Sequence, residues 1–430
     1  MSQSPAPDAE RFVIDVRSEV GRLQGVVLHR PGPEVTQMTP ANAERALYSD
    51  ILNLDVAVQE YAQLEGVLAQ WTRTFQIRDL LQEILRTARV RETLVERVCS
   101  QEHVPQLATR LGTMDPTDLT RALIEGVPLE RDNLTRFLSP ERFALPPLHN
   151  FFFTRDAAAA VGDRVLIGRM ASRVRDREAL IMEAIFDFHP LFRTETVNPA
   201  RHGASGREVT IEGGDLLVAR EDVLMVGVGQ RTSTQAVDFL IERLKGESRA
   251  TQSTRHLLVQ LLPHEPESFI HLDMVFTFLD HDACMVFAPL VTEHNHHPTV
   301  HVEIAGGAVR RIGEVETLQE GLQELGFHLE PILCGGREDR WQQEREQWHS
   351  GTNFFALAPG KVIGYARNVH TLEELDRHGF AILPADQVIS GQADPAAHDR
   401  CVITIGGSEL ARGGGGCRCM TLPIARDAVV

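Results

Sequence analysis

The chain has 430 residues, of which 43% are apolar, and its formal net charge is −17 at pH 7. A chain of this length can bury a large core, in one elaborate domain or in several simpler ones. The acidic excess argues against a nucleic-acid partner, because phosphate binding requires a basic face, and it is compatible with the steering of a cationic small molecule. No apolar run is long enough to cross a membrane, so we expect no membrane partner.

The first predicted element is an apolar strand in the stretch GRLQGVVLHRPGPE, residues 21–34. The stretch CMTLPIARD, residues 419–427, predicts another strand near the other end of the chain. These two strands are far apart in sequence, and they could supply one hairpin together.

A helical pattern follows, from residue 39 to about residue 138. One helix face collects apolar side chains at three- and four-residue steps, namely Val58, Tyr61, Leu64, Leu68, Trp71 and Phe75. The stretch DPTDLTRALIEG predicts a short helix, with Asp115 as N-cap, Pro116 at its first position and Gly126 as its end. We therefore predict an all-helical module, about residues 75–148, inserted into a strand-rich domain.

The remaining chain repeats one outline, in which an apolar strand, a polar turn and a second apolar strand follow each other. The outline recurs at residues 150–170, 210–229, 271–290 and 352–368. The turn pairs Gly162-Asp163, Glu221-Asp222 and His281-Asp282 lie about 60 residues apart. Such units favour a closed ring, because closure removes exposed sheet edges. An ordinary α/β chain with evenly spaced hairpins is the alternative, and spacing alone does not decide between them.

Chemically active side chains stand at the leading strand of each unit. They are Asp156, Glu212 with Asp215, His271 with Asp273, and near the end Cys419. If the hairpins are related by rotation, equivalent strand positions converge on the axis of the ring. We therefore expect the carboxylates, the histidine and the thiol to share one pocket.

Such a pocket suits a guanidinium or amidinium substrate. Carboxylates bind the planar guanidinium fork by paired, charge-assisted hydrogen bonds. A free thiol has a pKa of about 8.5, so a cationic substrate and a nearby imidazolium would both favour its ionisation. Each residue alone has an ordinary structural explanation, as a turn, ion-pair or core residue. Only their recurrence at equivalent places favours function.

Two further motifs have weaker functional interpretations. The stretch TEHNHHPTVHVE, residues 292–303, is conceivable as a divalent-metal site, but a solvated loop leading into a strand is the favoured interpretation. Cys417 and Cys419 lack the C-x-x-C spacing of thioredoxin-like or zinc sites, and no second cysteine pair completes a four-cysteine site. The six cysteines are thinly spread, which is typical of reduced thiols in a cytosol.

Several blocks together resemble a known family. GVVLHRPGPE, NFFFTRD, IEGGDLLV, HLDMVFTFLD and GGGGCRCMTLPIARD, in this order, are similar to arginine deiminase of the guanidino-group-modifying (pentein) superfamily. The likeness runs from about residue 23 to residue 427 and includes TPANAERALYSDILNLDVA at residues 39–57. It implies an α/β fold, a five-fold pseudosymmetric propeller with an inserted helical module. It also implies hydrolysis of free L-arginine to L-citrulline and ammonia, without metal or organic cofactor.

The resemblance also implies roles for individual residues. Cys419 would be the nucleophile and His271 the general acid and base, with Glu212 as the partner of His271. Asp156 and Asp273 would bind the guanidinium nitrogens. The remaining substrate-site positions that match the family are Arg231, Arg175, Arg412, Asn150, Phe153 and, in support of the histidine, Asp215.

The family resemblance leaves alternatives and departures. Agmatine deiminase or amidinotransferase activity keeps the fold but changes the substrate, and a non-catalytic arginine-binding protein is a further possibility. Cys417 and Arg418 stand where many relatives have other residues, and QEYAQL lacks a His-Asp pair of the family pattern. We expect one catalytic domain over residues 1–430, a homo-oligomer (dimer or tetramer) and a cytoplasmic location.

Overall fold

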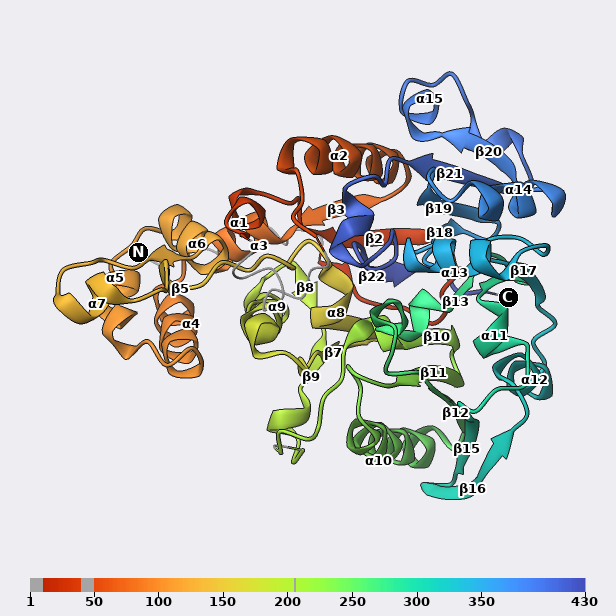
Figure 1. Ribbon diagram of the computed structural model, residues 1–430. Helices are drawn as coiled ribbons and strands as arrows, with labels where there is room; N and C mark the ends of the chain where they lie inside the picture. Colours follow the sequence, from red (N-terminus) through yellow and green to blue (C-terminus); the bar gives the residue numbers. More distant parts are fainter. Residues whose placement is uncertain (1–10, 40–49, 205, 430) are drawn as a thin grey trace, which may run out of the picture.

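The computed structural model describes residues 11–39, 50–204 and 206–429. Part of the family motif at residues 39–57, namely residues 40–49, lies outside the described residues. Figure 1 shows a strand-rich body and, on the left in orange, a mostly helical extension. No helix in these described ranges combines the length and apolar character that a membrane span requires.

In the described chain, five sheets contain the same unit of three strands. The first two strands of the unit pair antiparallel, and the second strand also pairs in parallel with the third. The five units are β6 (Ala158–Val161), β7 (Arg164–Ile167) and β9 (Glu195–Val197); β10 (Leu216–Arg220), β11 (Val223–Val228) and β12 (Arg255–Leu261); β13 (Phe276–Phe278), β14 (Ala283–Val286) and β17 (Glu330–Leu333); β18 (Phe355–Ala358), β19 (Lys361–Tyr365) and β21 (Cys401–Ile405); and β22 (Leu422–Arg426), β2 (Leu23–Leu28) and β3 (Arg73–Gln76). The expected pair of strands from opposite ends of the chain is confirmed, because β2 and β22 are antiparallel neighbours.

Helical crossovers join the parallel strands, as parallel pairing requires. The connecting helices are α1 (Pro33–Thr36) and α2 (Leu54–Trp71) before β3, α9 (Asp176–Phe188) before β9, α10 (Thr234–Thr251) before β12, α11 (Ala288–Val291) and α12 (Leu318–Glu324) before β17, and α14 (Val369–Arg377) and α15 (Ala385–Ile389) before β21. β15 (Thr299–Ala305) and β16 (Ala308–Val315) extend the second sheet, β20 (Ala381–Pro384) extends the fourth, and α13 (Arg340–Trp348) precedes β18. The histidine-rich stretch at residues 292–303 leads into β15, as the loop interpretation predicted.

The extension lies within residues 75–148, the range for which the sequence predicted a helical module. It contains α3 (Ile77–Ile84), α4 (Ala88–Gln101), α5 (Ala108–Gly112), α6 (Pro116–Glu125) and α7 (Leu134–Leu138), together with the paired strands β4 (Val127–Pro128) and β5 (Phe143–Leu145). The helix predicted after Asp115 is confirmed, since the Asp115 side chain accepts hydrogen bonds from the first turn of α6 and Gly126 follows with φ of 86°. Buried Leu81, Val98 and Leu123 belong to one apolar cluster with Ile181 of α9, which anchors the extension to the body.

Two predictions about this region are wrong. The helical pattern does not continue through Phe75, because residues Arg73–Gln76 form β3 alongside β2. The run of threonine and aromatic residues after Trp71 favours an extended backbone over a helix. The module is also not all-helical, since β4 and β5 pair within it.

Candidate active site

The residues predicted to converge lie in short turns directly before the first strand of each unit. Asp156 lies in α8 (Thr154–Ala157) before β6, and Glu212 and Asp215 lie at η4 (Gly213–Asp215) before β10. His271 and the following 3₁₀ helix η6 (Leu272–Met274) precede β13 in the same way, and Cys419 precedes β22. The prediction that these residues lie on the strands themselves is therefore wrong, because each lies in the turn that precedes its strand. Side chains within a strand alternate between the two faces of the sheet. A residue in the turn before the strand does not follow this alternation, so its side chain can point along the strand direction into a shared pocket.

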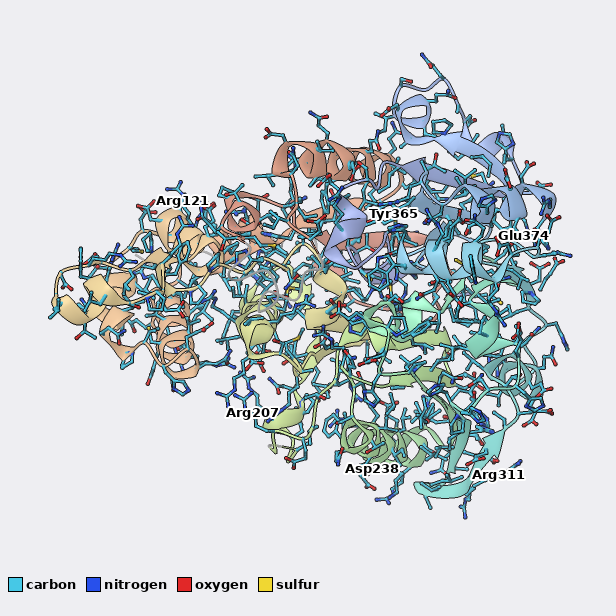
Figure 2. All side chains as sticks on the ribbon, in the orientation of Figure 1. Arg121, Arg207, Asp238, Arg311, Tyr365 and Glu374 are labelled. Carbon is cyan, nitrogen blue, oxygen red and sulfur yellow. The ribbon has the colours of Figure 1, made fainter. Side chains whose placement is uncertain are left out.

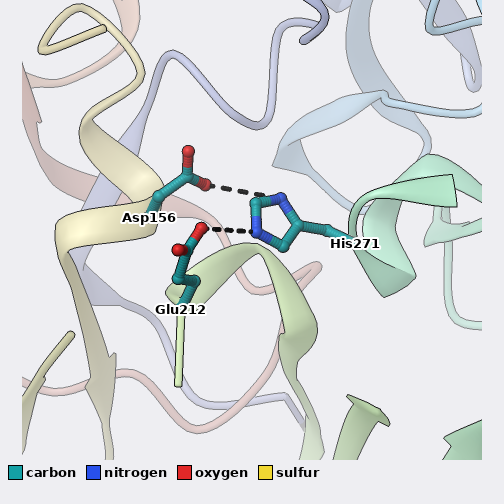
Figure 3. A group of neighbouring side chains, drawn as sticks. All are labelled: Asp156, Glu212 and His271. Carbon is teal, nitrogen blue, oxygen red and sulfur yellow. Dashed lines mark hydrogen bonds and ion pairs between the residues drawn. The ribbon is translucent and has the colours of Figure 1, made fainter. Parts of the chain in front are cut away.

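The imidazole of His271 lies between two carboxylates (Figure 3). Its Nε2 is 2.9 Å from Oε2 of Glu212, and its Nδ1 is 3.7 Å from Oδ1 of Asp156. Burial disfavours the charged ring, but Asp156 and the hydrogen bond with Glu212 outweigh burial and raise the pKa of His271 to about 9. A Cβ on Gly214 would stand 2.5 Å from Nδ1 of His271, so the glycine leaves room for the ring. The ring is therefore an imidazolium at neutral pH.

The thiol of Cys419 faces the carboxylate of Asp273. Its Sγ lies 3.7 and 3.9 Å from the two carboxylate oxygens, and the cysteine is buried. Burial and the charges of Asp273 and Asp156 raise the pKa of Cys419 well above its ordinary value. The backbone N–H of Arg155 donates to the carbonyl oxygen of Cys419 at 3.1 Å, which ties this thiol to the turn that carries Asp156. Burial and these two carboxylates therefore favour the thiol over the thiolate.

Asn353, which the sequence analysis missed, holds the backbone at the thiol. Its Oδ1 accepts hydrogen bonds from the N–H groups of Arg418 and Cys419 at 2.9 and 3.1 Å. Its Nδ2 donates to the carbonyl oxygen of Asp273 at 3.1 Å. The signal was present, because Asn353 opens the fourth hairpin with the same Asn-Phe-Phe sequence as Asn150 opens the first.

Glu212 and Asp215 support the histidine turn differently. Burial opposes ionisation of Glu212, but the hydrogen bond with His271 and the charge of Arg231 lower its pKa to about 2. Oδ1 of Asp215 accepts the N–H of Leu272 at 2.9 Å, which fixes the turn after His271. Burial raises the pKa of Asp215 to about 7. Asp215 therefore holds the backbone of this turn from behind.

The structure separates the three arginines expected to bind the substrate carboxylate. Arg175 is buried, and its guanidinium contacts Asp156 at 2.6 Å and Glu178 at 2.8 Å. Arg231 is 8% exposed, and its Nη1 is 3.9 Å from Oε1 of Glu212. Arg412 lies at the surface on η8 (Leu410–Gly413), where it pairs with Asp50. Only Arg175 and Arg231 contact the carboxylates around His271 in these ion pairs.

Glycines cover the thiol side of the cluster. The Phe153 ring lies so close to Gly413 and Gly415 that a Cβ on Gly415 would stand 2.5 Å from it. The hydroxyl of Tyr365, labelled in Figure 2, donates to the carbonyl oxygen of Gly415 at 3.0 Å. The backbone carbonyl of Asn150 accepts a hydrogen bond from Arg175 at 3.4 Å. A Cβ on Gly415 would also stand 3.1 Å from Cβ of Cys419, so this segment packs directly against the buried cysteine.

The histidine cluster has the spacing of a possible metal site. One potential ligand atom from each of Asp156, Glu212 and His271 lies within 4.8 Å of the others. A metal ligand must be a neutral imidazole, whereas the two carboxylates raise the pKa of His271 to about 9. Both ring nitrogens then carry protons and face carboxylate oxygens. This donor set fits an ion-pair cluster better than a metal centre.

Comparisons with known proteins agree on one family. A family model described as "Arginine deiminase" matches residues 44–426. The chain is similar to the arginine deiminase of Mycoplasma capricolum, with 31% identity over 96% of this chain and 97% of the relative. It is also similar to the arginine deiminase of Rhodococcus jostii, with 30% identity over 96% of this chain and 98% of the relative.

Solved structures show the fold alone, because their identity to this chain is low. The product-bound N-terminal domain of ArgZ, an arginine dihydrolase from cyanobacteria, matches with a TM-score of 0.51 and 13% identity, over 94% of this chain and 97% of that chain. Unliganded AgrE matches with a TM-score of 0.50 and 14% identity, over 94% of this chain and 40% of that chain. This chain therefore shares its mixed α/β fold with the N-terminal domain of ArgZ and with part of AgrE.

Proposed function

The chain belongs to the arginine deiminase family, and from this premise we infer that it hydrolyses free L-arginine to L-citrulline and ammonia. The observation that carries this inference is the buried group in which a thiol faces one carboxylate and an imidazolium lies between two others. A guanidinium is planar and cationic, so it fits between carboxylates that hold its nitrogens by paired hydrogen bonds. No metal or organic cofactor is needed for this chemistry.

We propose that Cys419 acts as nucleophile. Asp156 and Asp273 bind the guanidinium nitrogens, and the positive charge of the substrate offsets the carboxylates that hold the thiol protonated. The thiol gives its proton to solvent, and the thiolate then forms a bond to the guanidinium carbon. His271 gives its proton to the departing nitrogen, so that ammonia leaves and an amidino-thioether remains.

The second half of the reaction uses His271 as a base. The neutral imidazole takes a proton from water, and the resulting hydroxide adds to the amidino carbon. The carbon–sulfur bond breaks, the added hydroxyl group gives its proton to the leaving thiolate, and citrulline and the Cys419 thiol are released. Glu212 is 2.9 Å from the ring, so it stabilises the imidazolium that protonates ammonia and the imidazolium that forms again when water gives up its proton.

The direct test is the reaction itself. We expect the purified chain to release citrulline and ammonia in equal amounts from L-arginine, at the same rate with and without a metal chelator. Colorimetric citrulline and enzymatic ammonia assays measure both products. Absence of citrulline, or binding of arginine without turnover, would overturn the proposal and would favour a non-catalytic arginine-binding protein.

Arg231 is the residue we propose for recognition of the substrate α-carboxylate. Its ion pair with Glu212 is 3.9 Å long, whereas Arg175 forms ion pairs of 2.6 and 2.8 Å with other described residues. Replacement by alanine removes a charge-assisted hydrogen bond, so we expect the KM for arginine to rise about 10- to 100-fold. Agmatine has no carboxylate, so any turnover of agmatine should change little.

Arg121 provides the control for this variant, because it is an exposed arginine on the helical extension (Figure 2). Arg121→Ala should leave the KM for arginine unchanged. An Arg231→Ala variant that affects arginine and agmatine equally would argue against carboxylate recognition. Steady-state kinetics on both substrates measure the difference.

We also propose that the five units form a five-fold pseudosymmetric propeller. Their shared strand order and the pairing of β2 with β22 support this arrangement. Residues 1–430 would then form one catalytic domain, with the helical insertion at about residues 75–148. The apolar cluster shared by the extension and α9 supports one domain rather than two.

A cytoplasmic location and a homo-oligomeric state complete the proposal. All six cysteines are unpaired and buried, which suits a reducing compartment. α7 exposes large apolar side chains, namely Leu134, Phe137 and Leu138. Surfaces of this kind are typical of subunit interfaces, which supports a dimer or tetramer.

A further inference from the structure

Arg418, directly before the nucleophile, links two buried carboxylates. Its Nη1 donates to Oδ2 of Asp273 at 2.8 Å. Its Nε and Nη2 donate to the two carboxylate oxygens of Glu19, at 3.0 Å each. Nη2 also donates to the carbonyl oxygen of Leu216 at 2.7 Å. The planar fork of this arginine therefore fixes the position of Asp273 relative to Glu19.

Glu19 is itself held in place. It comes from the segment that precedes β2, and its Oε1 accepts the N–H of Val218 in β10 at 3.2 Å. Burial opposes its charge, but Arg418 and Arg155 outweigh burial and lower the pKa of Glu19 to about 2. Glu19 is thus a fixed negative charge that does not contact Cys419 or His271 in any of these hydrogen bonds and ion pairs.

This arrangement affects how strongly Asp273 can bind a second guanidinium. Arg418 and the substrate guanidinium compete for the same carboxylate. The negative charge of Glu19 offsets the positive charge of Arg418, which would otherwise repel a second guanidinium bound to Asp273. The charge of Glu19 therefore leaves Asp273 available to the substrate, while the Arg418 fork keeps its orientation.

We propose that Glu19 is a positioning residue for substrate binding, which acts through Arg418 on the carboxylate of Asp273. This inference rests on the proposed function, because Asp273 matters in this way only if the substrate carries a guanidinium. Sequence alone does not reveal it, since Glu19 lies outside the family blocks and 254 residues separate it from Asp273 along the chain.

The test replaces Glu19 by glutamine, which keeps the shape and removes the charge. Asp273 then becomes the single anionic partner of Arg418, and we expect the KM for arginine to rise about 10- to 100-fold. The kcat should change by less than about threefold, because the lost interaction serves ground state and transition state alike. Arg418→Lys keeps the charge but cannot bridge both carboxylates, so it should raise the KM as well.

A matched control and a double variant separate this role from general stability. Glu374 of α14 is a buried carboxylate at the periphery (Figure 2). It forms ion pairs with Arg377 of the same helix and with Arg337, which precedes α13. Glu374→Gln should leave the KM unchanged. Because Glu19 acts through Arg418, Glu19→Gln should add little to the KM of Arg418→Gln.

Three results would overturn the inference. They are a wild-type KM in both Glu19→Gln and Arg418→Lys, equal KM changes in Glu19→Gln and the Glu374→Gln control, and full additivity in the double variant. Failure of the proposed function is recognised separately, because the wild-type chain would then make no citrulline. Thermal unfolding of every variant identifies the fraction that is folded.

Discussion

Cys419→Ala is expected to lower citrulline formation at least about 10,000-fold, because removal of a nucleophile abolishes covalent catalysis. The buried side chain lies close to Gly415, and its thiol is 3.7 Å from Asp273. Arginine should still bind to the variant, since the guanidinium-binding carboxylates are unchanged. A citrulline assay measures the loss of turnover, and a thermal shift with arginine measures the retained binding.

Cys417→Ala is the matched control, because the second thiol is buried two residues away. Burial raises the pKa of Cys417, so it stays protonated and takes no part in attack. We expect turnover within about threefold of wild type and a small loss of stability from the missing sulfur. Retained turnover in Cys419→Ala, or loss of turnover in Cys417→Ala alone, would show that Cys419 is not the nucleophile.

The hairpins of the fold were predictable because their signals are local. A polar turn between two apolar runs, as at Gly162-Asp163, determines both strands and their antiparallel pairing. The choice of a third, parallel partner is not local, so β3 was mistaken for the end of a helix. The strand after the histidine-rich loop was predicted, but its pairing with β12, which extends the second sheet, depends on contacts between distant segments and was not.

The candidate site was predictable as a set of turns, but its ion pairs were not. Repetition marked the turns that carry Asp156, Glu212 and His271, and these side chains do meet in the structure. Arginine side chains are long, so their partners depend on the packing around them rather than on their place in the sequence. For this reason Arg412, expected at the substrate, lies at the surface, and the bond between Arg418 and Glu19 went unnoticed.

His271→Asn is expected to lower kcat about 100- to 10,000-fold, because proton transfer both to ammonia and from water is lost. In the wild-type chain, kcat/KM should fall as the pH rises through about 9, where the imidazolium loses its proton. The free energy of unfolding should fall over the same alkaline pH range as kcat/KM. The folded-state pKa is raised above the unfolded value of about 6.5, so the stabilisation is complete below that pH and disappears as the pH rises through about 9.

His189→Asn is the control with the opposite sign. Burial lowers the pKa of His189, which follows the C-terminus of α9 and lies 3.4 Å from Glu83 of the helical extension. Its replacement should leave the alkaline fall in kcat/KM and in the unfolding temperature intact, whereas His271→Asn should remove the alkaline fall in unfolding temperature. Measurements between pH 6 and 10 therefore assign the alkaline limb to one imidazolium, and the same limb in His271→Asn would contradict that assignment. The assignment matters for the chemistry, because only a histidine charged at neutral pH can protonate the departing ammonia and then become the base that activates water.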